Sequence, residues 1–164
     1  MEKIVIVNDK DKVIGCKDRY KSNCRTDIYR VSALWIENKK GEILLARRSL
    51  TKKHNSGKWG PAVAGTNADG ETYKLNIIKE SREELGLINV NPLKLRKEFV
   101  KNKYQHFTQW FYIILNDVKE FQYQKEEVEE IRWFKEEDLL VLTKNNPSNF
   151  LEGMEKWIKE FKLK

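Results

Sequence analysis

The fold expected for this chain follows first from one predicted helix that lies between short apolar segments. Residues 72–85 predict a helix that ends at Gly86, because glycine adopts the left-handed conformation that commonly follows a helix. The segments on either side are short, apolar and joined by polar turns, which is typical of strands. Strands combined with a few helices predict an α/β domain, with a mixed β-sheet sandwiched between α-helices.

The expected strands fall into neighbouring pairs. They span residues 3–8 with 12–15, 30–37 with 42–47, and 93–100 with 106–115, and a last short strand spans 130–134. A short helix is expected over 136–142, and a C-terminal helix begins at Pro147, a favoured first helical position. The apolar residues of this last helix lie on one helical stripe, namely Phe150, Leu151, Met154, Trp157, Ile158 and Phe161. We interpret the stripe as core packing, with a partner-binding helix as the alternative.

Composition favours one globular domain over residues 1–164. The chain is 40% hydrophobic and 11% aromatic, which fits a packed core and excludes a disordered chain. Because no apolar run reaches the roughly 18 residues that span a bilayer, we expect a cytoplasmic protein without membrane association. The net charge of +7 comes from lysines scattered through the whole chain. A nucleic-acid partner is therefore the less favoured alternative to an anionic small molecule, and a homodimer stays open.

The two cysteines, Cys16 and Cys24, have no metal-ligand spacing, since CxxC pairs and nearby histidines are absent. A reducing compartment disfavours a disulfide between them. We expect two free thiols, and loss of either one should leave catalysis unchanged.

Three glutamates crowd one face of the expected helix. At about 100° per residue, Glu83 and Glu84 lie within about 60° of Glu80, while Ile77 and Leu85 lie on the buried side. Like charges at these spacings repel. A divalent cation would relieve the repulsion, and carboxylate oxygens suit Mg²⁺ or Mn²⁺. A solvated acidic face is the alternative that this helix alone leaves open.

The spacing around these glutamates resembles a known motif. Gly65 is followed after five residues by Glu71, and after seven more by Lys79 and the acidic cluster. The segment 65–87 resembles the Nudix box, G-x5-E-x7-R-E-U-x-E-E-x-G-U, where U is a bulky apolar residue. The matching positions are Gly65, Glu71, Glu80, Glu83, Glu84, Gly86 and Leu87. Lys79 stands where arginine is usual, and Ser81 stands at an apolar position.

This resemblance implies a Nudix fold and magnesium-dependent hydrolysis of a diphosphate linkage in a nucleoside diphosphate joined to another group. A nucleoside triphosphate or a nucleotide sugar is the default substrate, and Mn²⁺ is the alternative metal. By resemblance, the catalytic residues and metal ligands are Glu80, Glu83 and Glu84, the Gly65 carbonyl is a further ligand, and Glu71, Lys79 and Gly86 are structural. Glu80 is the favoured general base, because a carboxylate can deprotonate a metal-bound water.

A second acidic run, residues 126–130, precedes the last expected strand. In many Nudix proteins a glutamate from a loop in this region supplies another metal ligand or the base. Glu127 is the candidate here, and a solvated loop is the alternative reading.

Basic residues precede the motif in the expected loop after residue 47. Arg47, Arg48, Lys52 and Lys53 are the candidates for binding the substrate's phosphates. The pattern R-R-x-x-x-K-K followed by G-x-W also resembles isopentenyl-diphosphate isomerases. That subgroup carries a catalytic cysteine and a metal-binding histidine where this chain has Ala64 and Thr66. An isomerase-like enzyme, a prenyl diphosphate hydrolase and an RNA-processing, decapping-type protein therefore remain as alternatives to the nucleotide hydrolase.

Aromatic residues near the motif have two readings. They could stack on a base or pack the core, and we favour core packing for Trp59, Tyr104, Phe107, Trp110, Phe111 and Tyr112.

Overall fold

The computed structural model describes residues 2–23, 25–116 and 120–161. The strands are β1 Lys3–Val7, β2 Val13–Asp18, β3 Ile28–Asn38, β4 Ile43–Arg48, β5 Trp59–Pro61, β6 Val63–Thr66, β7 Leu93–Lys101, β8 Gln105–Leu115 and β9 Val128–Phe134. The helices are α1 Tyr73–Leu85, α2 Glu136–Asn145, the 3₁₀ turn η1 Pro147–Asn149 and α3 Met154–Glu160. The strands and the first two helices that the sequence predicts are therefore confirmed, with shifts of a few residues at their ends.

Strand β3 is the centre of the sheet. It runs parallel to β8 from the pair Tyr29–His106 to the pair Asn38–Leu115, and antiparallel to β1, β6 and β4. Strand β7 continues the sheet beyond β8, β2 continues it beyond β1, and both β5 and β9 pair with β4. The sheet is mixed, because the β3–β8 pair is parallel and the remaining pairs are antiparallel.

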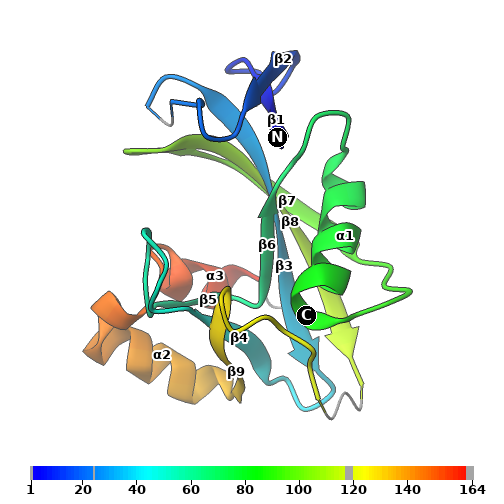
Figure 1. Cartoon of the computed structure of the whole chain (residues 1–164). Helices are drawn as coiled ribbons and strands as arrows, with labels where there is room; N and C mark the ends of the chain where they lie inside the picture. The colour runs from blue at the N-terminus through cyan, green and yellow to red at the C-terminus, as the bar shows by residue number, and fades with distance from the viewer. Residues whose placement is uncertain (1, 24, 117–119, 162–164) are drawn as a thin grey trace.

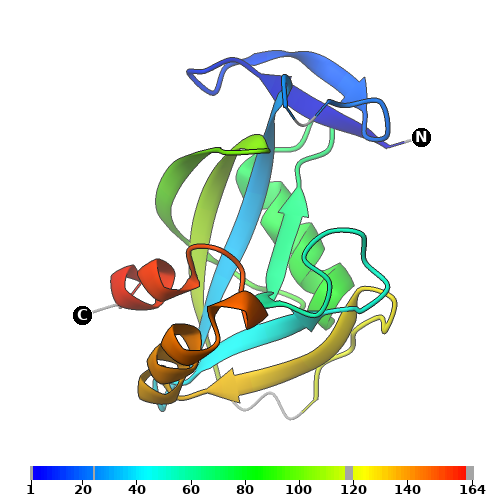
Figure 2. The same cartoon turned by 90° about the vertical axis from the view of Figure 1, so that its left-hand side faces the viewer.

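Helices cover both faces of this sheet. Successive residues of a strand point to opposite faces, so Ala33 and Trp35 of β3 face one side, while Leu34 and Ile36 face the other. Helix α1 packs on the side of Leu34, and α2 and α3 pack on the side of Trp35. Figure 1 shows α1 on one face of the sheet and α2 and α3 on the other, and Figure 2 shows the same arrangement turned by 90°. The predicted fold class, an α/β fold with a mixed sheet between helices, is confirmed.

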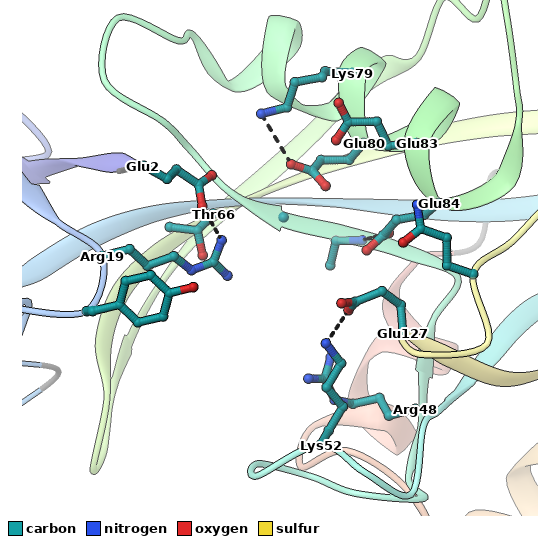
Figure 3. A pocket seen from close by; sticks show the side chains of 14 residues that line it. Glu2, Arg19, Arg48, Lys52, Thr66, Lys79, Glu80, Glu83, Glu84 and Glu127 are labelled. Carbon is teal, nitrogen blue, oxygen red and sulfur yellow. Dashed lines mark hydrogen bonds and ion pairs between the residues drawn. The ribbon is translucent and has the colours of Figure 1, made fainter.

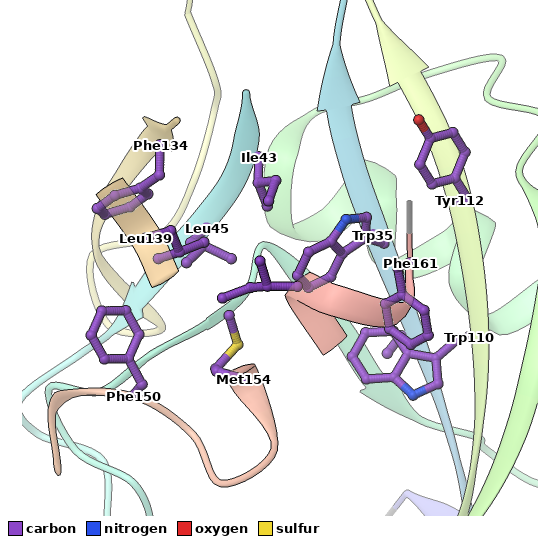
Figure 4. Close-up of a cluster of buried hydrophobic side chains, with 12 residues drawn as sticks. Trp35, Ile43, Leu45, Trp110, Tyr112, Phe134, Leu139, Phe150, Met154 and Phe161 are labelled. Carbon is purple, nitrogen blue, oxygen red and sulfur yellow. The ribbon is translucent and has the colours of Figure 1, made fainter. Parts of the chain in front are cut away.

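A buried cluster rich in aromatic side chains lies between the sheet and helices α2 and α3 (Figure 4). Trp35 makes edge contacts with Trp110 and Phe161, at ring-centroid distances of 6.3 and 5.3 Å. Trp110 is 1% exposed and Tyr112 is 2% exposed, so both are core residues. Burial of these rings is a large part of the hydrophobic stabilisation of this layer.

The C-terminal segment differs from the expected continuous helix. Phe150 is extended, with φ −122° and ψ 156°, and the backbone N–H of Leu151 donates to the carbonyl of Trp59 at 2.9 Å. Helix α3 begins only after Gly153, whose φ of 96° interrupts any helix. The prediction of one helix from Pro147 is wrong, because pairing with β5 draws residues 150 and 151 out of helical geometry. The predicted burial of the apolar stripe is nevertheless found at Phe150, Met154, Ile158 and Phe161.

The expectations for the cysteines, for membrane association and for the domain count are tested to different extents by the structure. Cys16 lies on β2 as a free thiol, whereas Cys24 lies outside the described residues. Among the described residues, the helices are all too short or too polar to cross a membrane. The single domain over residues 1–164 stays a prediction.

His106 on β8 makes stability depend on pH. Burial lowers the pKa of His106 to about 4, from an ordinary value of 6.5. Below pH 6.5 His106 is protonated in the unfolded chain but stays neutral in the folded chain. The free energy of unfolding therefore falls as the pH drops toward 4. We expect a loss of about 2 kcal/mol between pH 7.5 and pH 5 from this residue alone.

Urea unfolding of His106→Gln at these two pH values tests this expectation. The substitution should remove about 2 kcal/mol of the acid-induced loss, while His54→Gln, at an exposed position, should leave that loss intact. An unchanged pH dependence in His106→Gln would contradict the assignment.

Candidate functional site

A polar cavity of about 530 Å³ lies beside α1. Its walls come from α1, β6, the segment after β4, the residues before β9 and the β1–β2 hairpin. The lining residues are Glu2, Arg19, Tyr20, Arg48, Lys52, Ala64, Gly65, Thr66, Lys79, Glu80, Glu83, Glu84, Gln124 and Glu127. Figure 3 shows the three helix glutamates on one side of this space and the cations Arg48 and Lys52 below them.

Local signals at both ends hold α1 in register. The Thr72 hydroxyl accepts a hydrogen bond from the Leu75 N–H at 3.2 Å, which caps the first turn. Gly86 has φ 69° and its N–H bonds the carbonyls of the last turn, as a left-handed cap does. Ser81 is fully buried at the position where the motif has an apolar residue, and its hydroxyl is satisfied by the Ile77 carbonyl at 2.7 Å.

Strand β6 holds two of the glutamates. A Cβ on Gly65 would lie 2.2 Å from the Glu80 carboxyl carbon, so the Glu80 side chain occupies the space that only glycine leaves. The Ala64 N–H donates to Glu84 Oε2 at 3.1 Å. The close contact between β6 and α1 therefore sets the positions of both carboxylates.

Glu71 and Lys79 form a small network behind these carboxylates. Glu71 accepts from the Ala68 N–H at 2.9 Å and pairs with Lys79 Nζ at 2.7 Å. Lys79 Nζ also lies 3.5 Å from Glu80 Oε1. Lys79 thus links Glu71 and Glu80 as a point charge, without the bidentate geometry that arginine offers.

Asn76 is a site residue that the sequence reasoning missed. Its Nδ2 donates to Glu80 Oε1 at 3.2 Å, to Glu71 Oε2 at 2.9 Å and to the Thr66 carbonyl at 3.3 Å. The side chain is fully buried, and its Oδ1 has no hydrogen-bond partner among the described residues. The available signal was an amide side chain one helical turn before Glu80, a spacing that places it on the same helix face as the carboxylates.

Asn76→Ala should lower kcat by about tenfold, because Glu80 loses a donor that holds its carboxylate in place. KM should change much less, since Asn76 does not line the cavity. Steady-state kinetics checks this split, and circular dichroism controls for folding, because a buried network loses about 1–3 kcal/mol when a partner is removed. An unchanged kcat in a folded variant would refute the positioning role.

The carboxylates differ in their electrostatics. Burial, followed by the nearby charge of Glu80, raises the pKa of Glu84 to about 8. Burial also raises the pKa of Glu80, with Lys79 opposing the shift. Burial alone would raise the pKa of Glu71, but the hydrogen bonds from Lys79 and Ala68 outweigh it and the pKa is lowered. In the absence of a cation, the cavity therefore disfavours the charged forms of Glu80 and Glu84.

Two of the four predicted phosphate-binding residues reach the cavity. Arg48 and Lys52 line it, and Lys52 Nζ pairs with Glu127 Oε2 at 2.5 Å. Arg47 Nε instead donates to the Gly57 carbonyl at 3.0 Å, which braces the loop after β4. Lys53 is exposed and is not among the lining residues. Glu127 thus lines the same cavity as the helix glutamates, whereas Arg47 and Lys53 do not line it.

The cavity chemistry fits a divalent cation. In the present conformation, no three acidic, histidine or cysteine side chains of the described residues are gathered closely enough to hold one. The donors on the cavity wall are nevertheless hard oxygens, from Glu80, Glu83 and Glu84, with the Gly65 backbone beside them. A cation there would favour the charged form of Glu84, which burial and the nearby charge of Glu80 disfavour.

Comparison with known proteins decides the family. The family profile described as NUDIX domain matches residues 28–160. The chain belongs to the Nudix family. This confirms the resemblance carried by the segment 65–87.

Solved structures share the Nudix fold. DR0079 from Deinococcus radiodurans is 20% identical with a TM-score of 0.81, covering 96% of this chain and 98% of that one. A MutT protein from Methanosarcina mazei Go1 is 23% identical with a TM-score of 0.68, covering 82% and 92%. At these identities the likeness shows the fold alone.

Curated relatives match part of the Nudix chain. An isopentenyl-diphosphate Delta-isomerase of Salmonella heidelberg is 34% identical over 87 residues, which is 52% of this chain and 48% of the relative. The chain thus spans about half the length of the curated relatives it matches. The similarity is consistent with the isomerase-like pattern in the basic loop.

Proposed function

We propose that this Nudix protein is a pyrophosphohydrolase that cleaves a diphosphate linkage in a nucleoside diphosphate derivative, with a nucleoside triphosphate or a nucleotide sugar as the default substrate. The observation that carries the proposal is the cavity that joins Glu80, Glu83 and Glu84 to Arg48 and Lys52 (Figure 3). Carboxylates suit a metal ion and cations suit phosphate oxygens, so the two sets together fit a metal-bound diphosphate.

The metal of this proposal is Mg²⁺, with Mn²⁺ as the alternative. Glu80, Glu83 and Glu84 would hold it, the Gly65 carbonyl would be a further ligand, and Glu127 would join from the other side of the cavity. When bound, the ion neutralises phosphate oxygens and lowers the pKa of a bound water.

The protein's own residues would carry the remaining steps. Arg48 and Lys52 bind the phosphate oxygens and orient the linkage. Glu80, held by Asn76 and Lys79, accepts the proton of the attacking water. The water oxygen forms the new bond to phosphorus, the bond from phosphorus to the bridging oxygen breaks, and the bridging oxygen leaves on the other phosphate. Glu127 is the second candidate for the base, because it also faces this space.

A prenyl diphosphate hydrolase is the less favoured alternative. A prenyl chain would need an apolar wall to bury its methyl groups. The lining of this cavity contains charged and polar side chains, and beyond Tyr20 its apolar contribution is limited to Ala64 and Gly65. The lining therefore favours a polar group attached to the diphosphate.

The isomerase alternative lacks a proton donor. Ala64 and Thr66 both line the cavity, at the positions where the isomerases carry cysteine and histidine. Proton transfer to an alkene needs an acid at the reacting carbon, and the alanine methyl group supplies none. Isomerase activity is therefore the weaker candidate, despite the names of the curated relatives.

Product release by the purified protein tests the proposal. The panel holds nucleoside triphosphates, nucleotide sugars, dinucleoside polyphosphates, capped RNA and isopentenyl diphosphate, each with Mg²⁺, Mn²⁺ or a chelator. We expect metal-dependent cleavage of a nucleotide, and none of isopentenyl diphosphate. Isomerisation of isopentenyl diphosphate, or turnover that survives the chelator, would overturn the proposal. Cleavage of capped RNA alone would favour the decapping-type alternative. The cytoplasmic location and a homodimer stay predictions.

A further inference from the structure

The β1–β2 hairpin forms a wall of the cavity that the Nudix motif does not account for. Arg19 and Tyr20 directly follow β2, Glu2 directly precedes β1, and all three line the cavity. Figure 3 shows Arg19 and Glu2 on the side opposite Glu84 and Glu127. The hairpin therefore faces whatever is attached to a diphosphate bound at the carboxylates.

Tyr20 presents an exposed ring at this wall. It is 88% exposed, a large value for an aromatic residue. Its backbone is nevertheless held, because the Tyr20 N–H donates to Asp18 Oδ1 at 2.9 Å and the Arg19 N–H donates to the Glu2 carbonyl at 3.0 Å. An aromatic face on a fixed backbone, beside a cavity, suits stacking on another planar ring.

Arg19 and Glu2 complement this ring. Arg19 Nη1 lies 3.0 Å from Glu2 Oε2, and the side chains are 49% and 44% exposed. The Arg19–Glu2 pair is neutral overall. It therefore attracts a phosphate group less than Arg48 does on the opposite side of the cavity. The pair offers N–H donors and a carboxylate acceptor side by side, as the edge of a nucleobase requires.

We propose that Tyr20, Arg19 and Glu2 form a nucleobase subsite, in which the base stacks on Tyr20 and its polar edge bonds the Arg19–Glu2 pair. The substrate then spans the cavity with its base at the hairpin and its diphosphate at the α1 carboxylates. This inference rests on the proposed function and deepens it, because it assigns residues outside the Nudix motif to recognition of the base.

Calorimetric binding in Mg²⁺ tests the subsite. The probes are the α,β-methylene analogues of ATP, GTP, CTP and UTP, and methylenediphosphonate, which carries the diphosphate without a base. We expect Tyr20→Ala to weaken binding of at least one nucleotide analogue by about tenfold, since base stacking on an aromatic residue contributes this much. Binding of methylenediphosphonate should not change. Tyr20→Phe should bind as the wild type does, and Arg19→Gln should alter the preference among the four bases.

Lys21→Ala is the matched control, because Lys21 follows Tyr20 in the same turn but is exposed and does not line the cavity. It should bind every probe normally. Equal losses for nucleotide and methylenediphosphonate in Tyr20→Ala, or no loss for any nucleotide, would overturn the subsite. A wild type that binds methylenediphosphonate as tightly as the nucleotides would overturn the subsite and leave the diphosphate chemistry standing. A wild type that binds no probe and hydrolyses no substrate would overturn both.

Discussion

Glu84→Gln should lower turnover by about a thousandfold while the protein stays folded. A carboxylate that helps to hold the metal contributes several kcal/mol to transition-state stabilisation, and each 1.36 kcal/mol is tenfold in rate. The amide oxygen of glutamine can still accept the hydrogen bond that the Ala64 N–H donates to Glu84. The hydrogen bond between β6 and α1 is therefore preserved while the charge is removed.

Stability of the metal-free protein separates this effect from misfolding. Burial and Glu80 raise the pKa of Glu84 to about 8, so a charge there opposes folding above the ordinary pKa of about 4.5. The neutral glutamine should therefore leave the free energy of unfolding unchanged or raise it by an amount on the order of 1 kcal/mol at neutral pH. Mg²⁺ should raise the melting temperature of the wild type more than that of the variant. Normal turnover in Glu84→Gln would refute the role of Glu84.

Gly65→Ala should reduce turnover by about a hundredfold, because its Cβ would lie 2.2 Å from the Glu80 carboxyl carbon. The Glu80 side chain has to leave its position beside Asn76, and a displacement of about 1 Å in a reacting group can cost this much. The effect is steric, since the backbone of Gly65 is not in the left-handed region. Steady-state kinetics with the substrate identified by the panel measures the loss.

A further variant makes the test of Gly65 specific. Gly70→Ala meets no atom within 4 Å but has φ +80°, so it should lose stability and keep its turnover. A Gly65→Ala variant as active as the wild type would show that Glu80 tolerates displacement.

Local patterns predicted two of the three expected strand pairs, β1 with β2 and β7 with β8. The expected pairing of residues 30–37 with 42–47 exists only at Glu37 and Ile43, and β3 pairs along its whole length with β8 instead. The long partner of β4 is β9, eighty or more residues further along the chain. Alternating hydrophobicity identifies a strand but not its neighbour, because strand order depends on which faces must be buried together.

The carboxylate face of α1 was determined by the sequence alone, because helical geometry places Glu80, Glu83 and Glu84 together whatever the rest of the chain does. The glycine end of the helix was determined in the same way, since Gly86 accepts the left-handed conformation without strain. The family followed from the spacing of these same residues.

Only the tertiary structure decided which other residues face those carboxylates. It turned Arg48 and Lys52 toward the cavity and Arg47 toward the Gly57 carbonyl, although all three belong to one basic run. It also placed Asn76 in contact with Glu80, and it placed Tyr20, which follows β2, on the cavity wall formed by the β1–β2 hairpin. Side-chain direction in a loop and contact between distant segments depend on the packing of the whole sheet, which no local spacing encodes.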